Sequence, residues 1–203
     1  MYVIGLTGEI AVGKSSAARM LANRGAVVID GDQLVHELYA GHQALLADII
    51  ERFGPDVLAP DSSLDRAALG RTVFPDPAAL ADLERLVHPH VRAAQEELLA
   101  KARREDRVLA VLDAVKLVES GAGTLVDELW IVTAPSAAQQ RRLQARGLDD
   151  AAIASRLAVQ QPWEEKARLF LRELPARPIV LLANGGTLRE LRAQVDRLWP
   201  ALS

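Results

Sequence analysis

The chain has 203 residues, of which 50% are hydrophobic and 25% charged, and this composition suits one compact domain with a sizeable core. It contains no cysteine, which excludes disulfides, thiolate metal sites and cysteine nucleophiles. The net charge of −3 comes from well-mixed acidic and basic residues, so we expect no nucleic-acid partner and no binding to an anionic membrane surface. The chain shows no basic leader and no apolar run long enough for a bilayer, so we expect a cytoplasmic protein.

Five short apolar runs rich in β-branched residues predict buried strands. They lie at 2–7, 26–29, 108–112, 129–133 and 179–183. Because these runs are almost continuously apolar rather than alternating, they predict an α/β fold whose parallel sheet is covered by helices on both faces. Amphipathic helical stretches separate the runs, as crossover connections require.

A glycine-rich segment follows the first predicted strand. From Gly8 to Ser15 it matches the pattern GxxxxGK[ST] and leads into a helix that should stop at Gly25. In such a loop the backbone amides point at phosphate oxygens, Lys14 reaches the β- and γ-phosphates, and the Ser15 hydroxyl ligates Mg²⁺. The alternative is an ordinary strand-to-helix turn with a chance lysine. The position between strand and helix favours a phosphate-binding loop for ATP.

Carboxylates follow the second and third predicted strands. Asp30 and Asp32 flank Gly31, and Asp113 follows the third strand. At the carboxyl edge of a parallel sheet, Asp32 would accept a proton from an attacking hydroxyl, and another carboxylate would hold Mg²⁺. Capping of a helix at 33–39 is the alternative for Asp30 and Asp32, and a turn is the alternative for Asp113.

The stretch 33–105 between the second and third strands is mostly helical in pattern and far longer than the dozen or so residues that a crossover needs. We therefore predict a helical lobe inserted into the sheet domain. Within this lobe, 88–90 reads as a junction between helices because of its central proline. Acceptor choice should come from such an insertion, since a phosphate loop binds ATP in nearly any kinase.

The helix predicted after the fourth strand should stop at Gly147 and carries Arg142 and Arg146, spaced to share one face. Arginines on a lid stabilise charge on a transferring phosphoryl group. Ordinary surface exposure is the alternative. We predict a lid at 136–165, a helix beginning near Asp149 that this residue caps, and a last helix at 188–198.

Several blocks, in this order, resemble the dephospho-CoA kinase family. They are IGLTGEIAVGKSS, GAVVIDGDQLVHEL, LDRAALGRTVF, LVHPHVR, RRLQAR and SRLAVQQ. The resemblance implies a single kinase domain over 1–203 of the phosphate-loop kinase type, with a five-stranded parallel sheet, a helical substrate-binding lobe and a lid. The implied reaction is ATP-dependent phosphorylation of the ribose 3′-hydroxyl of dephospho-CoA, the final step of coenzyme A biosynthesis.

Carried over by position, the resemblance also implies roles for individual residues. Asp32 would be the base, Lys14 and Arg142 would act in catalysis, and Ser15 would ligate Mg²⁺. ATP would be bound by Gly8, Ala11, Val12, Gly13, Lys14, Ser15, Ser16 and Arg146, and dephospho-CoA by Arg66, His88 and Arg92. The chain departs from the family pattern at Glu9, Ala11, His36 and Lys116. Glu9 and Ala11 replace glycines and should place side chains beside the phosphates, with a negative charge at Glu9.

Three alternatives remain open from the sequence. A related phosphate-loop kinase would act on another nucleoside or small metabolite. A degenerate, non-catalytic homologue is suggested by Glu9 and Lys116. A nucleotide-binding switch is the third alternative, and the sequence lacks the NKxD segment that guanine-specific switches usually carry. We expect a monomer or small homo-oligomer.

Overall fold

The computed structural model of the protein describes residues 1–158 and 160–199. It divides into two compact units. The first, which we call the sheet unit, is Met1–Asp30 with Leu99–Ser203; the second, the helical unit, is Gly31–Leu98. The insertion predicted at 33–105 overlaps the helical unit, and its substrate-binding role stays a prediction.

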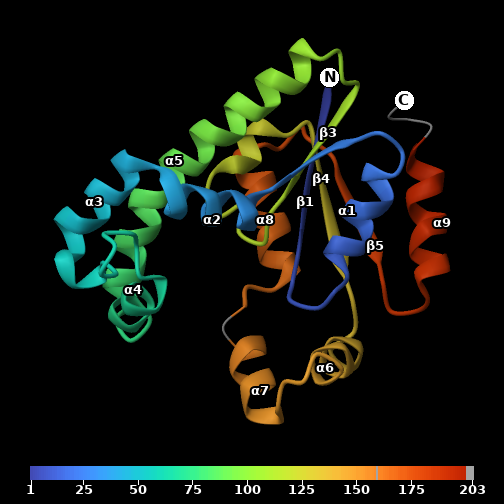
Figure 1. The fold of residues 1–203 in the computed structure, drawn as a ribbon. Helices are drawn as coiled ribbons and strands as arrows, with labels where there is room; N and C mark the ends of the chain where they lie inside the picture. Colours follow the sequence, from blue (N-terminus) through green and yellow to red (C-terminus); the bar gives the residue numbers. More distant parts are fainter. Residues whose placement is uncertain (159, 200–203) are drawn as a thin grey trace. The chain divides into compact units, whose positions relative to one another are not determined.

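Within the described residues the sheet unit contains one five-stranded parallel sheet in the order β2-β3-β1-β4-β5 (Figure 1). The strands are β1 (Tyr2–Gly8), β2 (Val27–Asp30), β3 (Leu109–Asp113), β4 (Glu128–Thr133) and β5 (Ile179–Ala183). All five predicted strands are confirmed, and no bound differs from its prediction by more than one residue. The predicted α/β fold is confirmed with them.

Helices cover both faces of this sheet. Side chains of β1 such as Ile4 pack with α1 (Lys14–Ala22) and α9 (Leu188–Leu198) on one face. On the other face Val3 belongs to a cluster that includes Phe170 of α8 (Trp163–Glu173). This two-sided burial is the reason that the strands are continuously apolar. The helices α6 (Ser136–Gln144) and α7 (Asp150–Ala158) lie beyond the carboxyl ends of the strands (Figure 1).

Glycines end two of the helices, as predicted. After α6 the amide of Gly147 donates to the carbonyl of Gln144 at 2.8 Å, and the amide of Leu148 donates to that of Leu143 at 3.3 Å. Gly147 has a φ of 83°, so this is the two-bond cap in which a left-handed residue reverses the chain. The same pattern occurs at Gly25 after α1. No helix within 1–158 and 160–199 is long and apolar enough to cross a membrane.

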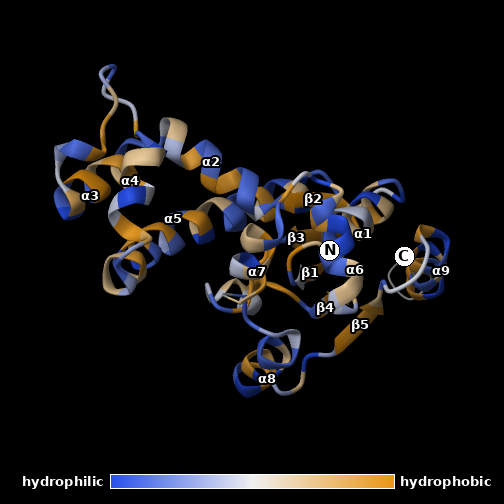
Figure 2. Cartoon of the chain, turned by 90° about the horizontal axis from the view of Figure 1, so that it is seen from below, coloured by the Kyte–Doolittle hydropathy of each residue, from blue (hydrophilic) through white to orange (hydrophobic). Residues whose placement is uncertain are grey.

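The helical unit has a core of its own. It comprises α2 (Gly31–Gly41), α3 (Gln43–Phe53), α4 (Arg66–Val73), the short helix η1 (Pro55–Val57) and most of α5 (Pro77–Arg104). The four longer helices carry apolar residues that are visible along the ribbon (Figure 2). The buried members of the core are Leu34, Leu38, Leu45, Ile49, Val57, Leu69, Val73, Ala79, Leu83 and Val87.

The predicted helix junction at 88–90 is wrong, because α5 runs unbroken through Pro89. Val87 on one side of the proline and Val91 on the other both pack into the core of the helical unit, so tertiary burial continues along the same face. Proline removes one helical hydrogen bond, that to the carbonyl of Arg85. Pro89 and Arg85 are both exposed, so water can bond that carbonyl.

Candidate active site

The loop between β1 and α1 has a backbone that only glycine fits at two places. Gly13 has a φ of 98°, and a Cβ atom there would lie 2.1 Å from Nδ2 of Asn184. A Cβ atom on Gly8 would lie 2.5 Å from the carbonyl oxygen of Val132 in β4. Both glycines therefore let the loop curl tightly against β4 and the segment after β5, as the sequence motif requires.

Ala11 adopts a left-handed conformation with a φ of 58°, which is unusual for a residue with a Cβ atom. Its side chain is buried in a small apolar cluster with Leu143 of α6 and Ile153 of α7. The expectation that Ala11 places a side chain beside the phosphates is therefore wrong. The Cβ atom packs against the helices that follow β4, and this burial offsets part of the backbone strain.

The loop leads into the N-terminus of α1. Gly13 is the N-cap residue, and among the described residues no side chain caps this end of the helix. The first backbone amides of a helix have no partner within the helix, and its dipole favours negative charge there. Ser15 is exposed on this first turn and Ser16 is half-buried. The arrangement suits binding of phosphate groups.

Lys14 forms an ion pair with Asp113, the last residue of β3. The pairing of Leu6 with Asp113 across β1 and β3 brings the end of β3 beside the loop. Asp30 is paired with Asp113 across β2 and β3, so a second carboxyl-bearing residue ends at the same edge of the sheet. The Asp113 side chain is only 5% exposed and that of Lys14 13% exposed. This ion pair holds the ammonium group at the start of α1.

A buried lysine that the sequence did not single out fixes the segment after Asp113. Nζ of Lys166 donates to the carbonyl of Val115 at 2.9 Å and forms an ion pair with Glu119. The hydroxyl of Thr7 donates to the same Val115 carbonyl at 2.9 Å. Lys166 lies on the buried face of α8, four residues before Phe170, and a lysine at such an apolar position is the signal that could have found it.

Arg142 lies against the carbonyl side of the loop. One of its terminal nitrogens donates to the carbonyls of Ala11 and Val12, each at 3.0 Å, and the other donates to that of Asn184 at 2.8 Å. Asn184, which is buried, also donates to the Val12 carbonyl at 2.7 Å. These contacts support the loop from behind. The roles of Arg142 in catalysis and of exposed Arg146 in ATP binding stay predictions.

Replacing Arg142 with alanine should raise the KM for ATP by about tenfold, because the loop loses a charged donor to three carbonyls. Steady-state kinetics with varied ATP will measure this effect. Arg142→Lys is the matched control: it keeps the charge but cannot reach three acceptors, so it should not restore the KM. A large fall in kcat with an unchanged KM would instead favour the predicted lid role, in which the guanidinium meets the transferring phosphoryl group.

Asp32 lies in the helical unit, in the first turn of α2, and its side chain is exposed. The helix begins at Gly31, so the alternative in which Asp32 caps a helix at 33–39 is wrong. A carboxylate in the first turn still gains from the helix dipole. The role of Asp32 as the base stays a prediction.

Arg66 begins α4 and contacts His36 of α2. Two guanidinium nitrogens of Arg66 lie 3.2 and 3.0 Å from the two ring nitrogens of His36. Burial raises the pKa of the nearby Tyr39 hydroxyl, and the positive charge of Arg66 opposes part of that rise. The pair thus places an exposed cationic group on the surface of the helical unit.

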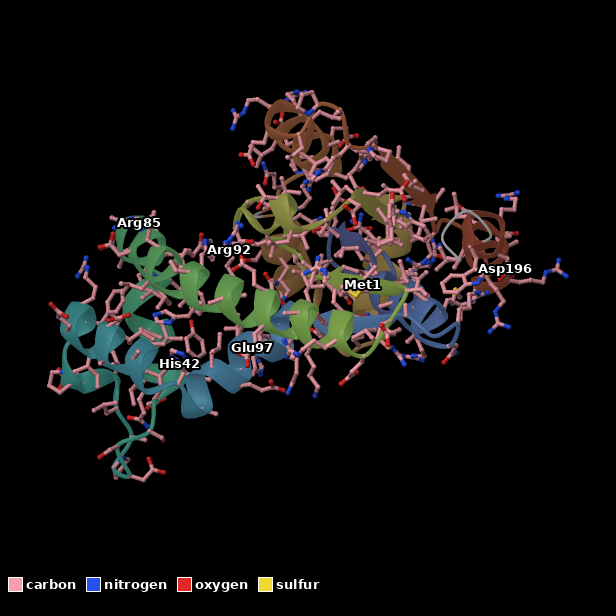
Figure 3. The ribbon with its side chains drawn as sticks, turned by 90° about the horizontal axis from the view of Figure 1, so that it is seen from above. Met1, His42, Arg85, Arg92, Glu97 and Asp196 are labelled. Atoms are coloured by element: carbon pink, nitrogen blue, oxygen red, sulfur yellow. The ribbon has the colours of Figure 1, made fainter. Side chains whose placement is uncertain are left out.

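His88 and Arg92 lie four residues apart on α5, a spacing that puts them on one face of this helix. Figure 3 shows Arg92 on this helix. Nε of Arg92 donates to Glu96 at 3.0 Å. The three residues predicted to bind the acceptor, Arg66 among them, therefore all belong to the helical unit. Their role in acceptor binding stays a prediction.

Comparison with known proteins shows that the chain is similar to kinases. The model of a family described as dephospho-CoA kinase matches residues 2–171. The chain is 44% identical to a dephospho-CoA kinase of Symbiobacterium thermophilum over 202 residues, covering 99% of this chain and 81% of that protein. It is 42% identical to a dephospho-CoA kinase of Geobacter sulfurreducens over 200 residues, 98% of either chain. A solved structure from Thermus thermophilus matches with a TM-score of 0.78 at 32% identity, covering 100% of this chain and 98% of that one.

Proposed function

The chain belongs to the dephospho-CoA kinase family, and on that premise we propose that it transfers the γ-phosphoryl group of ATP to the ribose 3′-hydroxyl of dephospho-CoA. This transfer is the final step of coenzyme A biosynthesis. The observation that carries the proposal is the loop from Gly8 to Ser16, which runs into the N-terminus of α1. No side chain of the described residues caps this helix end, and Lys14 at its first position is held by the ion pair with Asp113. A site of this kind binds the phosphates of a nucleotide.

Phosphoryl transfer depends mostly on positioning and on stabilising negative charge. The backbone amides at the start of α1 bind phosphate oxygens, and the Lys14 ammonium neutralises charge that moves toward the leaving β-phosphate. Asp32 accepts the proton of the ribose 3′-hydroxyl while the oxygen of that hydroxyl forms a bond to the γ-phosphorus. The bond from that phosphorus to the β–γ bridging oxygen breaks, and ADP leaves.

The oxygen donors near the loop fit a Mg²⁺ ion bound together with ATP. The Ser15 hydroxyl is exposed, and the Asp113 carboxylate lies at the same edge of the sheet; both are the hard oxygen ligands that Mg²⁺ prefers. Among the described residues no group of three His, Asp or Glu side chains suits a metal by itself. Mg²⁺ in kinases takes its other ligands from phosphates and water, and it neutralises charge on the β- and γ-phosphate oxygens.

A coupled assay of ADP release tests the proposed acceptor. Dephospho-CoA, adenosine, AMP and shikimate are compared at equal concentrations with ATP and Mg²⁺. We expect turnover with dephospho-CoA to exceed that with any of the others. Faster turnover of another acceptor would favour the related kinase acting on a different metabolite, and turnover of none would favour the degenerate homologue.

Removing Arg66 or Arg92 should raise the KM for dephospho-CoA by about tenfold and leave the KM for ATP nearly unchanged. Guanidinium groups bind a pyrophosphate through paired hydrogen bonds, and dephospho-CoA carries one. Arg66→Ala and Arg92→Ala are assayed with each substrate varied in turn. Arg85→Ala is the matched control, because Arg85 is an exposed arginine of α5 paired with Asp82. An equal rise in both KM values would place these arginines outside the acceptor site.

We also propose a cytoplasmic location, a monomer or small homo-oligomer, and no membrane or nucleic-acid partner. The modest and evenly mixed net charge supports the last of these. Light scattering of the purified protein at several concentrations measures the oligomeric state, and a large assembly would contradict the proposal.

A further inference from the structure

Glu9 is the second residue of the phosphate loop, and its carboxylate bonds groups far along the chain. We propose that Glu9 is a positioning residue that ties the loop to α6 and to the start of α8, and so holds the loop in the form that binds ATP phosphates. This inference rests on the proposed function. It gives a role to a residue that replaces a glycine of the family pattern.

Both carboxylate oxygens of Glu9 accept hydrogen bonds. Oε2 accepts from the side-chain amide of Gln139 at 2.9 Å, and Oε1 accepts from the backbone amide of Trp163 at 3.3 Å. Gln139 lies on α6 and is only 3% exposed, and its amide nitrogen also donates to the carbonyl of Ala134 at 3.1 Å. Both hydrogens of the Gln139 side-chain amide therefore have an acceptor, and one of these acceptors is Glu9.

The next loop residue joins the same network. The backbone amide of Ile10 donates to Oε1 of Gln160 at 2.8 Å, and the side-chain amide of Gln160 donates to Oε1 of Gln139 at 3.3 Å. Three hydrogen bonds therefore link Glu9, Gln139, Gln160 and Ile10 in turn, and the backbone between Glu9 and Ile10 closes the ring. Two consecutive loop residues are held by two glutamines, one on α6 and one just before α8.

Apolar contacts run beside these hydrogen bonds. Ile10 and buried Ala11 pack with Leu143 of α6 and Ile153 of α7. The loop is thus fastened to the helices after β4 by polar and apolar contacts at adjacent residues. A loop held in one conformation loses less entropy when it closes on a phosphate, so its fastening should strengthen ATP binding.

The direction of the Glu9 side chain determines whether its negative charge holds the loop in place or repels the phosphates of ATP. The sequence led us to expect this charge beside the phosphates, and the carboxylate accepts hydrogen bonds from donors on α6 and α8. Trp163 is the first residue of α8, so its amide belongs to a helix N-terminus, which favours a negative charge. The two interpretations of Glu9, fastening of the loop and repulsion of phosphate, predict opposite effects on ATP binding.

Calorimetric titration of the acceptor-free protein with ATP and Mg²⁺ measures those effects directly. We expect Glu9→Gln and Glu9→Ala to raise the Kd for ATP, by about threefold and about tenfold respectively, because Gln keeps the bond from Trp163 and Ala keeps neither. Tighter or unchanged binding by Glu9→Ala would overturn the proposal. Glu164→Gln is the matched control, since Glu164 is an exposed acid in the first turn of the same helix α8, and its Kd should not change.

A double-mutant cycle tests whether Glu9 acts through Gln139. Glu9→Ala should weaken ATP binding much less in a Gln139→Ala background than in the parent protein. Additive effects would contradict the coupling. Because Gln139 is buried and its variant risks losing stability, thermal unfolding of each variant is recorded, and the Glu9 variants decide the proposal where Gln139→Ala does not fold.

Trypsin gives a readout that needs neither ATP nor acceptor. Arg146 is exposed at the end of α6, and cleavage after it reports how firmly this helix end is held. We expect Glu9→Ala to be cut several times faster than the parent at an unchanged midpoint of thermal unfolding, and equal rates would overturn the proposal. Failure of the parent protein to bind ATP would overturn the proposed function instead, so the two failures are distinguishable.

Discussion

Replacing Lys14 with alanine is expected to slow phosphoryl transfer by about 10²- to 10³-fold, the loss usual for one charged or polar group that stabilises a transition state. Lys14 stands at the first position of α1, where the helix N-terminus and the loop amides already favour phosphate. The backbone amides are neutral, whereas the Lys14 ammonium carries a full positive charge. This charge stabilises the negative charge that develops on the β-phosphate as the bond to the γ-phosphorus breaks. Single-turnover kinetics at saturating ATP and acceptor will measure the effect on the chemical step.

The Lys14–Asp113 ion pair adds a second effect that must be separated from the first. Asp113 is nearly buried, so Lys14→Ala leaves its carboxylate without the ammonium group and should lower the free energy of unfolding by about 3 kcal/mol. Combining Lys14→Ala with Asp113→Asn removes both charges and should recover most of that stability without recovering activity. A double variant that turned over at the parent rate would show that Lys14 serves the fold alone, and the phosphate-loop assignment would be wrong.

Most of the sheet unit could be predicted from the sequence because its signals are local or periodic. A strand covered on both faces has to be apolar at nearly every position, so a continuous apolar run in the sequence marked each of the five strands. Gly25 and Gly147 ended their helices because a left-handed residue is needed there. Asp149 also fulfilled its prediction, since its carboxylate accepts from the amide of Ala152 at 2.8 Å at the start of α7.

The contacts that shape the site could not be predicted in the same way, because they join residues far apart in sequence. The two terminal nitrogens of Arg142 bond carbonyls at Val12 and Asn184, and nothing near Arg142 in sequence signals either partner. The helix break predicted at Pro89 is absent for a related reason. A local signal for a helix break was overridden by burial of Val87 and Val91 on the same helix. Long-range packing decides whether a helix continues through a proline. The pattern of a single sequence does not show which distant residues pack together.

Asp32→Asn is expected to lower kcat by about 10²- to 10⁴-fold, the range that a general base contributes, with little change in the KM for ATP. Asparagine has nearly the same shape as aspartate but does not accept a proton at neutral pH. The loop predicted to bind ATP is part of the sheet unit, whereas Asp32 belongs to the helical unit, and the substitution changes no residue of that loop. Steady-state kinetics with both substrates varied will separate the two parameters.

The fold should tolerate this change, which makes the kinetic result decisive. Asp32 is exposed in the first turn of α2, where loss of its charge weakens the interaction with the helix dipole by about 0.3–1 kcal/mol. The matched control is Glu37→Gln, because Glu37 is an exposed carboxylate on the same helix and accepts a bond from Gln33 at 3.1 Å. If Asp32 is the base, only Asp32→Asn loses kcat, and the loss at fixed ATP shrinks as rising pH ionises the acceptor hydroxyl without help. An Asp32→Asn enzyme that keeps the parent kcat would remove Asp32 from the reaction and leave the 3′-hydroxyl to be deprotonated by water or by the nucleotide's own phosphate.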